Sequence, residues 1–160
     1  MNFNHFDAEG NAVMVDVSNK QPTMRTAVAA AEIRLSPALL ATIREKGTAK
    51  GDVLGVARLA GIMAAKRTPD LIPLSHPLAI HSVAVDFHQD ETMERITAQC
   101  TVRAFERTGV EMEAMTGAAV AALTIYDMCK GSDKSITIGE IRLLYKEGGK
   151  SGVFRREEGV

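Results

Sequence analysis

The chain has no tryptophan, and aromatic residues make up only 4% of its 160 positions. So few aromatic side chains argue against a platform that stacks the bases of single-stranded nucleic acid. There is also no excess of either charge, because the formal net charge is -1 with 24% charged residues. A protein that binds nucleic acid nonspecifically usually carries a clear basic bias, so any anion site in this chain must be local.

Cysteine and long apolar segments are equally scarce. The chain has two cysteines, Cys100 and Cys129, no apolar N-terminal signal region, and no apolar run of membrane-spanning length. We therefore expect a reduced, cytoplasmic protein. No His or Cys pair has the spacing of a structural zinc site, so no metal site is expected.

What the chain does have is a large share of small aliphatic residues. At 160 residues and 46% hydrophobic composition it is long enough for one core and short for two. We expect a single domain over residues 14–147. Residues 1–13 show little periodicity, and the end of the chain is rich in glycine and charge, so 1–13 and 148–160 are expected to be flexible tails.

Hydrophobic periodicity and turn residues predict the elements of this domain. Ser36 and Pro37 form a typical helix start, and Asp52 is placed to cap the next helix. Strict alternation favours a β-hairpin in the middle of the chain. The expected order is a strand or helix at 27–35, helices at 37–46 and 53–66, an extended proline-rich loop at 71–77, strands at 81–88 and 95–105, a long helix at 109–130 and a strand at 135–145. This order predicts an α+β fold with a ferredoxin-like antiparallel sheet and helices packed on one face.

The long helix at 109–130 carries the most informative pattern. Its middle is almost uncharged, which predicts packing on most of its circumference, with Glu111 and Glu113 in the first turn and Asp127 and Lys130 in the last. Residues three apart share a face, so Asp127 and Lys130 can pair, and a partly desolvated lysine can act as an acid or base near neutral pH. A plain helix-end salt bridge is the alternative, and it is the commoner meaning of a single Asp-x-x-Lys.

A second group of candidates surrounds the loop at 71–77. His76 stands between Ser75 and Pro77 in a stiff segment, and a core position explains it less well than it explains His81 or His88 in a strand. Basic residues recur at glycine and proline turns, and they would form an anion pocket if the fold brought them together.

Four blocks of the chain together closely resemble one known family. The blocks are Met14–Ser18; Lys50–Asp52 followed by Ala60–Gly61 and Ala64–Thr68; Asp70–Pro77; and Thr108–Ala114 running on to Ala121–Lys130. In this order and with little gapping they resemble the cyclic pyranopterin monophosphate synthase family, also called the molybdenum cofactor biosynthesis protein C family. The resemblance extends from Met14 to Gly152.

The resemblance implies a lyase. Its substrate would be a cyclised dihydroguanosine triphosphate in which a ribose carbon is already bonded to the purine. Its products would be cyclic pyranopterin monophosphate and pyrophosphate. The resemblance further implies a homohexamer, a trimer of dimers with the active site at a dimer interface. No cofactor, nucleic acid or membrane is implied, and a divalent ion accompanying the triphosphate is left open.

The resemblance also implies roles for individual residues. The implied catalytic residues are Lys50, Asp127 and Lys130. The implied substrate contacts are Leu74, Ser75, His76, Met112 and Glu113, with Arg25, Lys66 and Glu111 near the pocket. Position 75 departs from the cysteine that often precedes this histidine in relatives, so a role for a thiol there is put in doubt, although serine keeps the size and some hydrogen bonding.

Two alternatives belong to other functional classes. A catalytically idle nucleotide-binding oligomer that acts through partner enzymes would keep a basic pocket but would not need Asp127. An RNA-binding ferredoxin-like domain would need paired exposed aromatics on the strands at 81–88 and 95–105, which are missing. The first alternative differs from the lyase in whether the nucleotide is consumed or only held.

Overall fold

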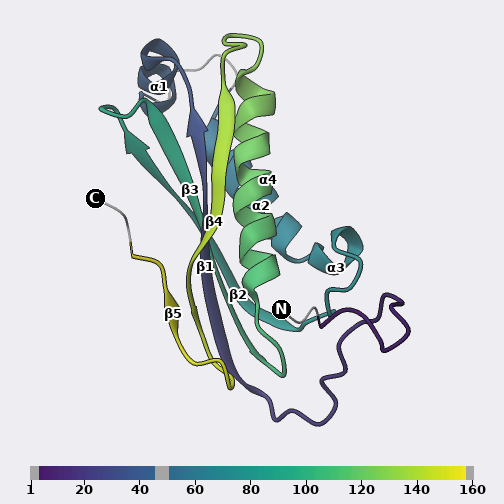
Figure 1. The fold of residues 1–160 in the computed structure, drawn as a ribbon. Helices are drawn as coiled ribbons and strands as arrows, with labels where there is room; N and C mark the ends of the chain where they lie inside the picture. Colours follow the sequence, from purple (N-terminus) through teal and green to yellow (C-terminus); the bar gives the residue numbers. More distant parts are fainter. Residues whose placement is uncertain (1–3, 46–50, 158–160) are drawn as a thin grey trace.

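The computed structural model describes residues 4–45 and 51–157. In chain order its elements are β1 (Thr23–Arg34), α1 (Pro37–Arg44), α2 (Val53–Ala65), α3 (Thr68–Leu71), β2 (Ile80–Asp90), β3 (Arg95–Glu106), α4 (Glu111–Cys129), β4 (Thr137–Glu147) and β5 (Phe154–Arg155). The strands form one sheet in the order β2-β3-β1-β4-β5, and all neighbouring strands are antiparallel. Figure 1 shows the long helix α4 beside the sheet, with α2 behind it. The expected α+β fold with helices on one face is confirmed.

The segment at 27–35, for which the sequence left strand and helix open, is the central strand β1. It pairs with β3 on one side and β4 on the other, and Ala29, Ala30, Ala31, Glu32 and Ile33 are all buried. Alanine favours a helix intrinsically, so hydrogen bonds and packing from two neighbouring strands decide the conformation here.

The predicted helix starts are confirmed and one short helix is new. Pro37 begins α1, and the Asp52 side chain accepts a hydrogen bond from Gly55 N at 2.9 Å at the start of α2. α1 ends at Arg44, two residues before the predicted end, which lies outside the described residues together with Lys50. α3 was not predicted, because proline residues favour extended chain as well as the first turn of a helix, and Pro69 here stands in a first helical turn.

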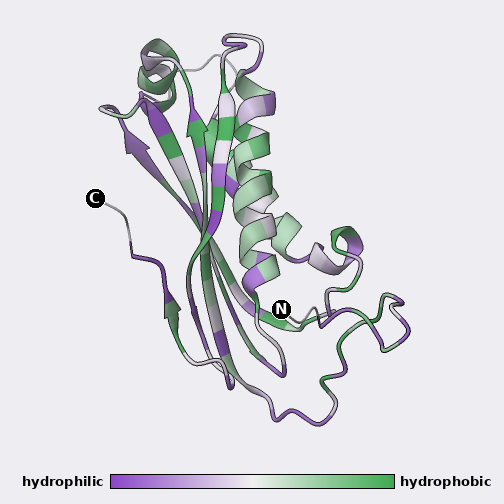
Figure 2. Cartoon of the chain, viewed as in Figure 1, coloured by the Kyte–Doolittle hydropathy of each residue, from purple (hydrophilic) through white to green (hydrophobic). Residues whose placement is uncertain are grey.

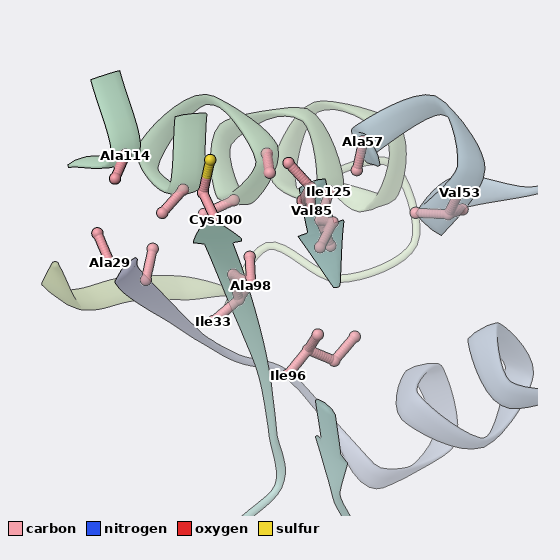
Figure 3. Packing of buried hydrophobic residues seen from close by; sticks show 14 of the residues in the cluster. Ala29, Ile33, Val53, Ala57, Val85, Ile96, Ala98, Cys100, Ala114 and Ile125 are labelled. Atoms are coloured by element: carbon pink, nitrogen blue, oxygen red, sulfur yellow. The ribbon is translucent and has the colours of Figure 1, made fainter. Parts of the chain in front are cut away.

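The core is built from small side chains that let α2 and α4 lie close to each other and to β3. A Cβ on Gly61 would stand 2.8 Å from Gly117 O, and a Cβ on Gly117 would stand 2.5 Å from Cys100 Sγ. Figure 3 shows Cys100 on β3 with its sulfur directed toward the helices. Burial raises the pKa of the Cys100 thiol to about 12, so this cysteine is a packing residue.

The opposite face of the sheet holds a buried charge. Glu32 of β1 is 4% exposed and accepts hydrogen bonds from Arg95 of β3 at 3.0 Å and from Arg142 of β4 at 2.9 Å. Figure 2 shows polar and apolar residues interspersed along the strands, as expected for a sheet with one covered face. The two arginines compensate the Glu32 carboxylate and tie the three central strands together.

The two ends of the chain contain some hydrogen-bonded structure. Phe6 and Ala12 form an isolated bridge, and β5 pairs with β4, although both lie in segments assigned to flexible tails. The mobility of these segments and the single-domain boundaries stay predictions. No helix within the described ranges is both long and apolar enough to cross a membrane.

Candidate active site

A cavity of about 580 Å³ lies where α4 begins, beside the loop that follows α3 and the N-terminal segment. Figure 1 shows these three segments together at one end of the helix layer. Six residues singled out by the sequence analysis line this cavity: Leu74, Ser75, His76, Glu111, Met112 and Glu113. The fold thus joins two candidate groups that lie more than thirty positions apart in the chain.

His76 is half-buried and held by the N-terminal segment. Its Nε2 lies 2.7 Å from Val15 O. A backbone carbonyl can only accept, so Nε2 carries the proton and donates this bond. The Nδ1 atom of a neutral His76 is then left as a hydrogen-bond acceptor, and it can take a proton from a molecule in the cavity.

Glu113 is buried in the first turn of α4, with only 2% of its surface exposed. Burial raises the pKa of its carboxyl from 4.5 to about 7, and the negative charge of Glu111 adds to this shift, while a backbone hydrogen bond opposes it. A carboxyl with such a pKa can give or take a proton near neutral pH. A carboxylate in a first helical turn is also favoured by the helix dipole alone, but the buried position of Glu113 at the cavity favours a functional role.

Glu111 is fixed at the cavity wall by a cation from another element. Its Oε1 accepts a hydrogen bond from Lys146 Nζ of β4 at 2.8 Å, and both side chains are about one quarter exposed. A carboxylate in the first turn of a helix is favoured by the helix dipole alone. The structure in addition gives Glu111 a specific ion pair with Lys146.

Several residues of the cavity were not singled out by sequence reasoning. The available signal lay in the blocks around positions 14–18 and 108–109, which carried the resemblance without being assigned a role. Lys20, an exposed lysine in a segment without periodicity, offered no signal. The missed lining residues are Asn4, His5, Val15, Val17, Lys20, Ile72, Pro73, Leu78, Thr108 and Gly109.

Lys66 lies next to this cavity but does not line it. It lines a second cavity of about 320 Å³ together with His81 of β2, and Leu78 is part of the lining of both cavities. Because the two cavities share Leu78, Lys66 is a candidate contact for an anionic ligand that extends beyond the first cavity.

Arg25 is buried and its guanidinium is engaged by the backbone. Nε donates to Glu106 O at 3.0 Å and Nη2 donates to Arg107 O at 3.1 Å. Arg25 does not line either of the two cavities. Within the chain it fixes the segment that leads into Thr108 and Gly109, and its predicted contact with substrate stays a prediction.

Asp127 and Lys130 lie at the opposite end of α4 from the cavity. The helix has 19 residues, and at about 1.5 Å per residue its ends are about 27 Å apart. Lys130 Nζ donates to Asp127 Oδ1 at 2.7 Å, and their side chains are 58% and 70% exposed. Within one chain this pair therefore does not meet His76 or Glu113.

The partly desolvated lysine considered for position 130 is not found in the single chain, where the Lys130 side chain is 58% exposed. The hydrogen bond to Asp127 raises the pKa of Lys130 above its ordinary value, whereas a role as acid or base near neutral pH needs a lowered pKa. The apolar middle of α4 does pack against the core, but Leu123 is 56% exposed and Met112 is 41% exposed. One side of α4 is thus uncovered, and Asp127 and Lys130 stand at the end of that side.

The site offers proton-transfer groups at its centre and a cation nearby. Among the described residues, no three His, Cys, Asp or Glu side chains are grouped as metal ligands. Glu113 and His76 can exchange protons with a bound molecule, and Lys20 places a positive charge on the wall. This combination suits acid–base chemistry on an anionic compound.

A family model described as the MoaC family matches residues 14–149. The chain belongs to the MoaC family. The family match includes the cavity residues from Val15 to Glu113, as well as Asp127 and Lys130, whereas Asn4 and His5 precede it.

Similar curated proteins cover the chain almost completely. A protein of Pelobacter propionicus is 82% identical over 159 residues, which is 99% of each chain. One of Geobacter sulfurreducens is 70% identical over 159 residues, again 99% of each. One of Rhodospirillum rubrum is 60% identical over 152 residues, 94% of this chain and 90% of the relative. All three are named cyclic pyranopterin monophosphate synthase.

Proposed function

We propose that this chain is a cyclic pyranopterin monophosphate synthase of molybdenum cofactor biosynthesis that works in the cytoplasm. It rearranges the cyclised dihydroguanosine triphosphate to cyclic pyranopterin monophosphate and releases pyrophosphate. The observation that carries the proposal is the cavity at the start of α4, whose lining includes both His76 and Glu113. Membership of the MoaC family and relatives of this name over 99% of the chain support it.

The chemistry of the cavity fits this reaction. Opening and reclosing rings on a purine requires proton transfers at several nitrogens and carbons, for which the cavity offers the Glu113 carboxyl, with its pKa raised to about 7, and the acceptor Nδ1 of His76. Release of pyrophosphate requires cations near the triphosphate, a role that we assign to Lys20 and Lys66. Leu74, Ser75 and Met112 line the cavity and are proposed to contact the substrate.

We assign proton transfer with the substrate to Lys50 and Lys130, with Asp127 orienting one of them. Lys50 lies outside the described residues. Lys130 is exposed in the single chain, and its raised pKa makes it a weak acid there. Burial against another subunit would disfavour its charged form and bring its pKa toward neutrality.

A second copy of the chain is the proposed source of that burial, in a homohexamer built as a trimer of dimers. A two-fold axis crossing α4 near its middle would bring Asp127 and Lys130 of one copy to the cavity of the other, and it would form two equal sites. The exposed apolar residues on the outer sides of α2 and α4 support this arrangement, since they would be covered by the contact. They are Val56, Leu59, Met63, Met112 and Leu123.

The direct test is pyrophosphate release from the cyclised triphosphate, with the product identified by mass. Wild-type protein is expected to turn over, and Asp127→Asn is expected to lose turnover while keeping its fold, since an exposed substitution usually changes the free energy of unfolding by less than about 0.5 kcal/mol. An active Asp127→Asn variant would remove Asp127 from the mechanism. Tight binding by the wild type without turnover would instead favour a protein that only holds the nucleotide.

The shared site is tested by mixing inactive variants. Asp127→Asn and His76→Ala would alter opposite halves of each site, so a mixed dimer has one intact site and one doubly altered site. Random exchange of subunits should then restore about a quarter of the wild-type activity. The matched control mixes His76→Ala with Glu113→Gln, which alter the same half and should not restore activity. Equal recovery in both mixtures would contradict a site shared between subunits.

A further inference from the structure

The C-terminal turn at 148–151 is tied to the wall of the candidate active site from two directions. Lys146, at the end of β4, donates from Nζ to Glu111 Oε1 at 2.8 Å and to Ser151 Oγ at 2.9 Å. Glu111 lines the cavity, whereas Lys146 and Ser151 do not. A single ammonium group therefore joins the turn to a side chain of the site.

The second connection runs through Arg25. Gly148 and Gly149 have φ values of +100° and +77°, and a Cβ on either one would collide with Met24 O or with the Arg25 guanidinium. The turn thus packs directly on Arg25, and glycine is required for both the backbone conformation and the space. Arg25 in turn donates to the carbonyls of Glu106 and Arg107, just before the cavity residues Thr108 and Gly109.

Glu111 is confined on its other side as well. A Cβ on Gly109 would collide with Glu111 Oε2, so the absence of a side chain at Gly109 leaves the space that this carboxylate occupies. With Gly109 on one side and Lys146 on the other, the Glu111 carboxylate has a defined position at the entrance to α4. Lys146 is itself held by Ser151, which lowers the entropy that the long lysine side chain loses on pairing.

We propose that Lys146 is a positioning residue that sets the Glu111 carboxylate for substrate binding, and that the turn at 148–151 is the brace that holds Lys146 and Arg25 in place. Lys146 acts through Glu111 and does not contact the substrate. The inference rests on the proposed function in using the cyclised triphosphate as the ligand. It gives the glycine-rich C-terminal turn a role in the site, although the family match ends at residue 149.

The test compares Lys146→Met with Lys146→Arg in steady-state kinetics. Lys146→Met removes the donors at similar length, so we expect KM to rise about tenfold with kcat within about twofold, because a mispositioned contact weakens binding in the ground and transition states alike. Lys146→Arg keeps donors for both partners and should restore most of the loss. Arg155→Met, which removes an exposed cation stacked on Tyr145 in the neighbouring strand, is the matched control and should leave KM unchanged.

A double-mutant cycle with Glu111→Gln separates positioning from general damage. If Lys146 acts through Glu111, then Lys146→Met should change KM by less than about twofold in the Glu111→Gln background. The same tenfold change in both backgrounds, or an unchanged KM in Lys146→Met alone, would overturn the proposal. Ser151→Ala provides a milder version, with an expected rise in KM of about threefold, should Lys146→Met fail to fold.

Failure of the proposed function would be recognised separately. If the wild-type protein makes no product, the reaction assignment fails. The dissociation constant for the cyclised triphosphate, measured by calorimetry, then takes the place of KM in the same cycle. An equal dissociation constant for wild type and Lys146→Met would refute the positioning role whether or not the protein is a catalyst.

Discussion

Replacing Glu113 with glutamine should remove a pH-dependent loss of stability. The Glu113 carboxyl is buried, and its pKa rises from 4.5 to about 7 in the folded chain. Each pKa unit corresponds to about 1.4 kcal/mol, so ionising the buried group costs about 3 kcal/mol. Glutamine has nearly the same shape and stays neutral at every pH.

The direction in which pH changes the stability of the wild type follows from proton binding at Glu113. Between pH 4.5 and about 7 the folded chain holds a proton on Glu113 that the unfolded chain has released. The contribution of the Glu113 carboxyl to the free energy of unfolding is therefore fully present below pH 4.5, and it is lost as the pH rises through about 7. The free energy of unfolding of the Glu113→Gln variant should therefore exceed that of the wild type by about 1 kcal/mol at pH 5 and by about 3 kcal/mol at pH 8.

The assay is urea denaturation of both proteins at pH 5 and pH 8, with one protein concentration used throughout so that any association affects both proteins alike. The difference in free energy of unfolding should grow by about 2 kcal/mol between these pH values. Glu157→Gln, an exposed change in the C-terminal segment, is the control and should show no such growth. A constant difference for Glu113→Gln would show that Glu113 is not a buried neutral carboxyl, and its assignment as a proton donor would fall with it.

Two further predictions concern the scaffold. Gly117→Ala should lower the free energy of unfolding by about 1–3 kcal/mol, because its Cβ would stand 2.5 Å from Cys100 Sγ. When Cys100→Ala is added, the double variant should recover part of this loss. Equal loss in both backgrounds would contradict the proposed contact. Asp52→Ala should lower the free energy of unfolding by about 1 kcal/mol in thermal denaturation, because it removes the cap bond from Gly55 N, whereas Asp52→Asn keeps an acceptor oxygen and should lose clearly less; equal losses would contradict the cap assignment.

Elements with strong local signals could be predicted from the sequence. The hairpin of β2 and β3 has strict alternation on both sides of a polar turn, and α4 has a long apolar middle with acidic residues at its start. Both were expected within a few residues of their observed bounds. β1 remained ambiguous because its run of alanines suits either conformation, and only the pairing with β3 and β4 resolves it.

Within the candidate site, His76 was singled out from the sequence because it stands in a stiff loop, whereas Glu113 at a helix start suits a structural role equally well and was indicated by the family resemblance. The site was not predictable where it depends on contacts between distant segments. Nothing around Lys146 indicates that its ammonium meets Glu111, because the two residues come from different elements and meet only in the fold. Asp127 and Lys130 were singled out from the sequence, but their exposure was not foreseen, since the sequence of an apolar helix does not reveal which of its sides the chain itself covers.

Candidate groups lie at both ends of α4, so the length of this helix fixes the distance between them. Under the proposed two-fold arrangement, the distance between the cavity of one site and the catalytic pair of the other is set by the number of residues in one continuous helix of 19. Adding one turn would shift the pair by about 5.4 Å along the axis, and symmetry would repeat that error in the second site. The length of α4 thus determines the geometry of both sites at once, and we expect substitutions along it to be tolerated far more readily than insertions or deletions.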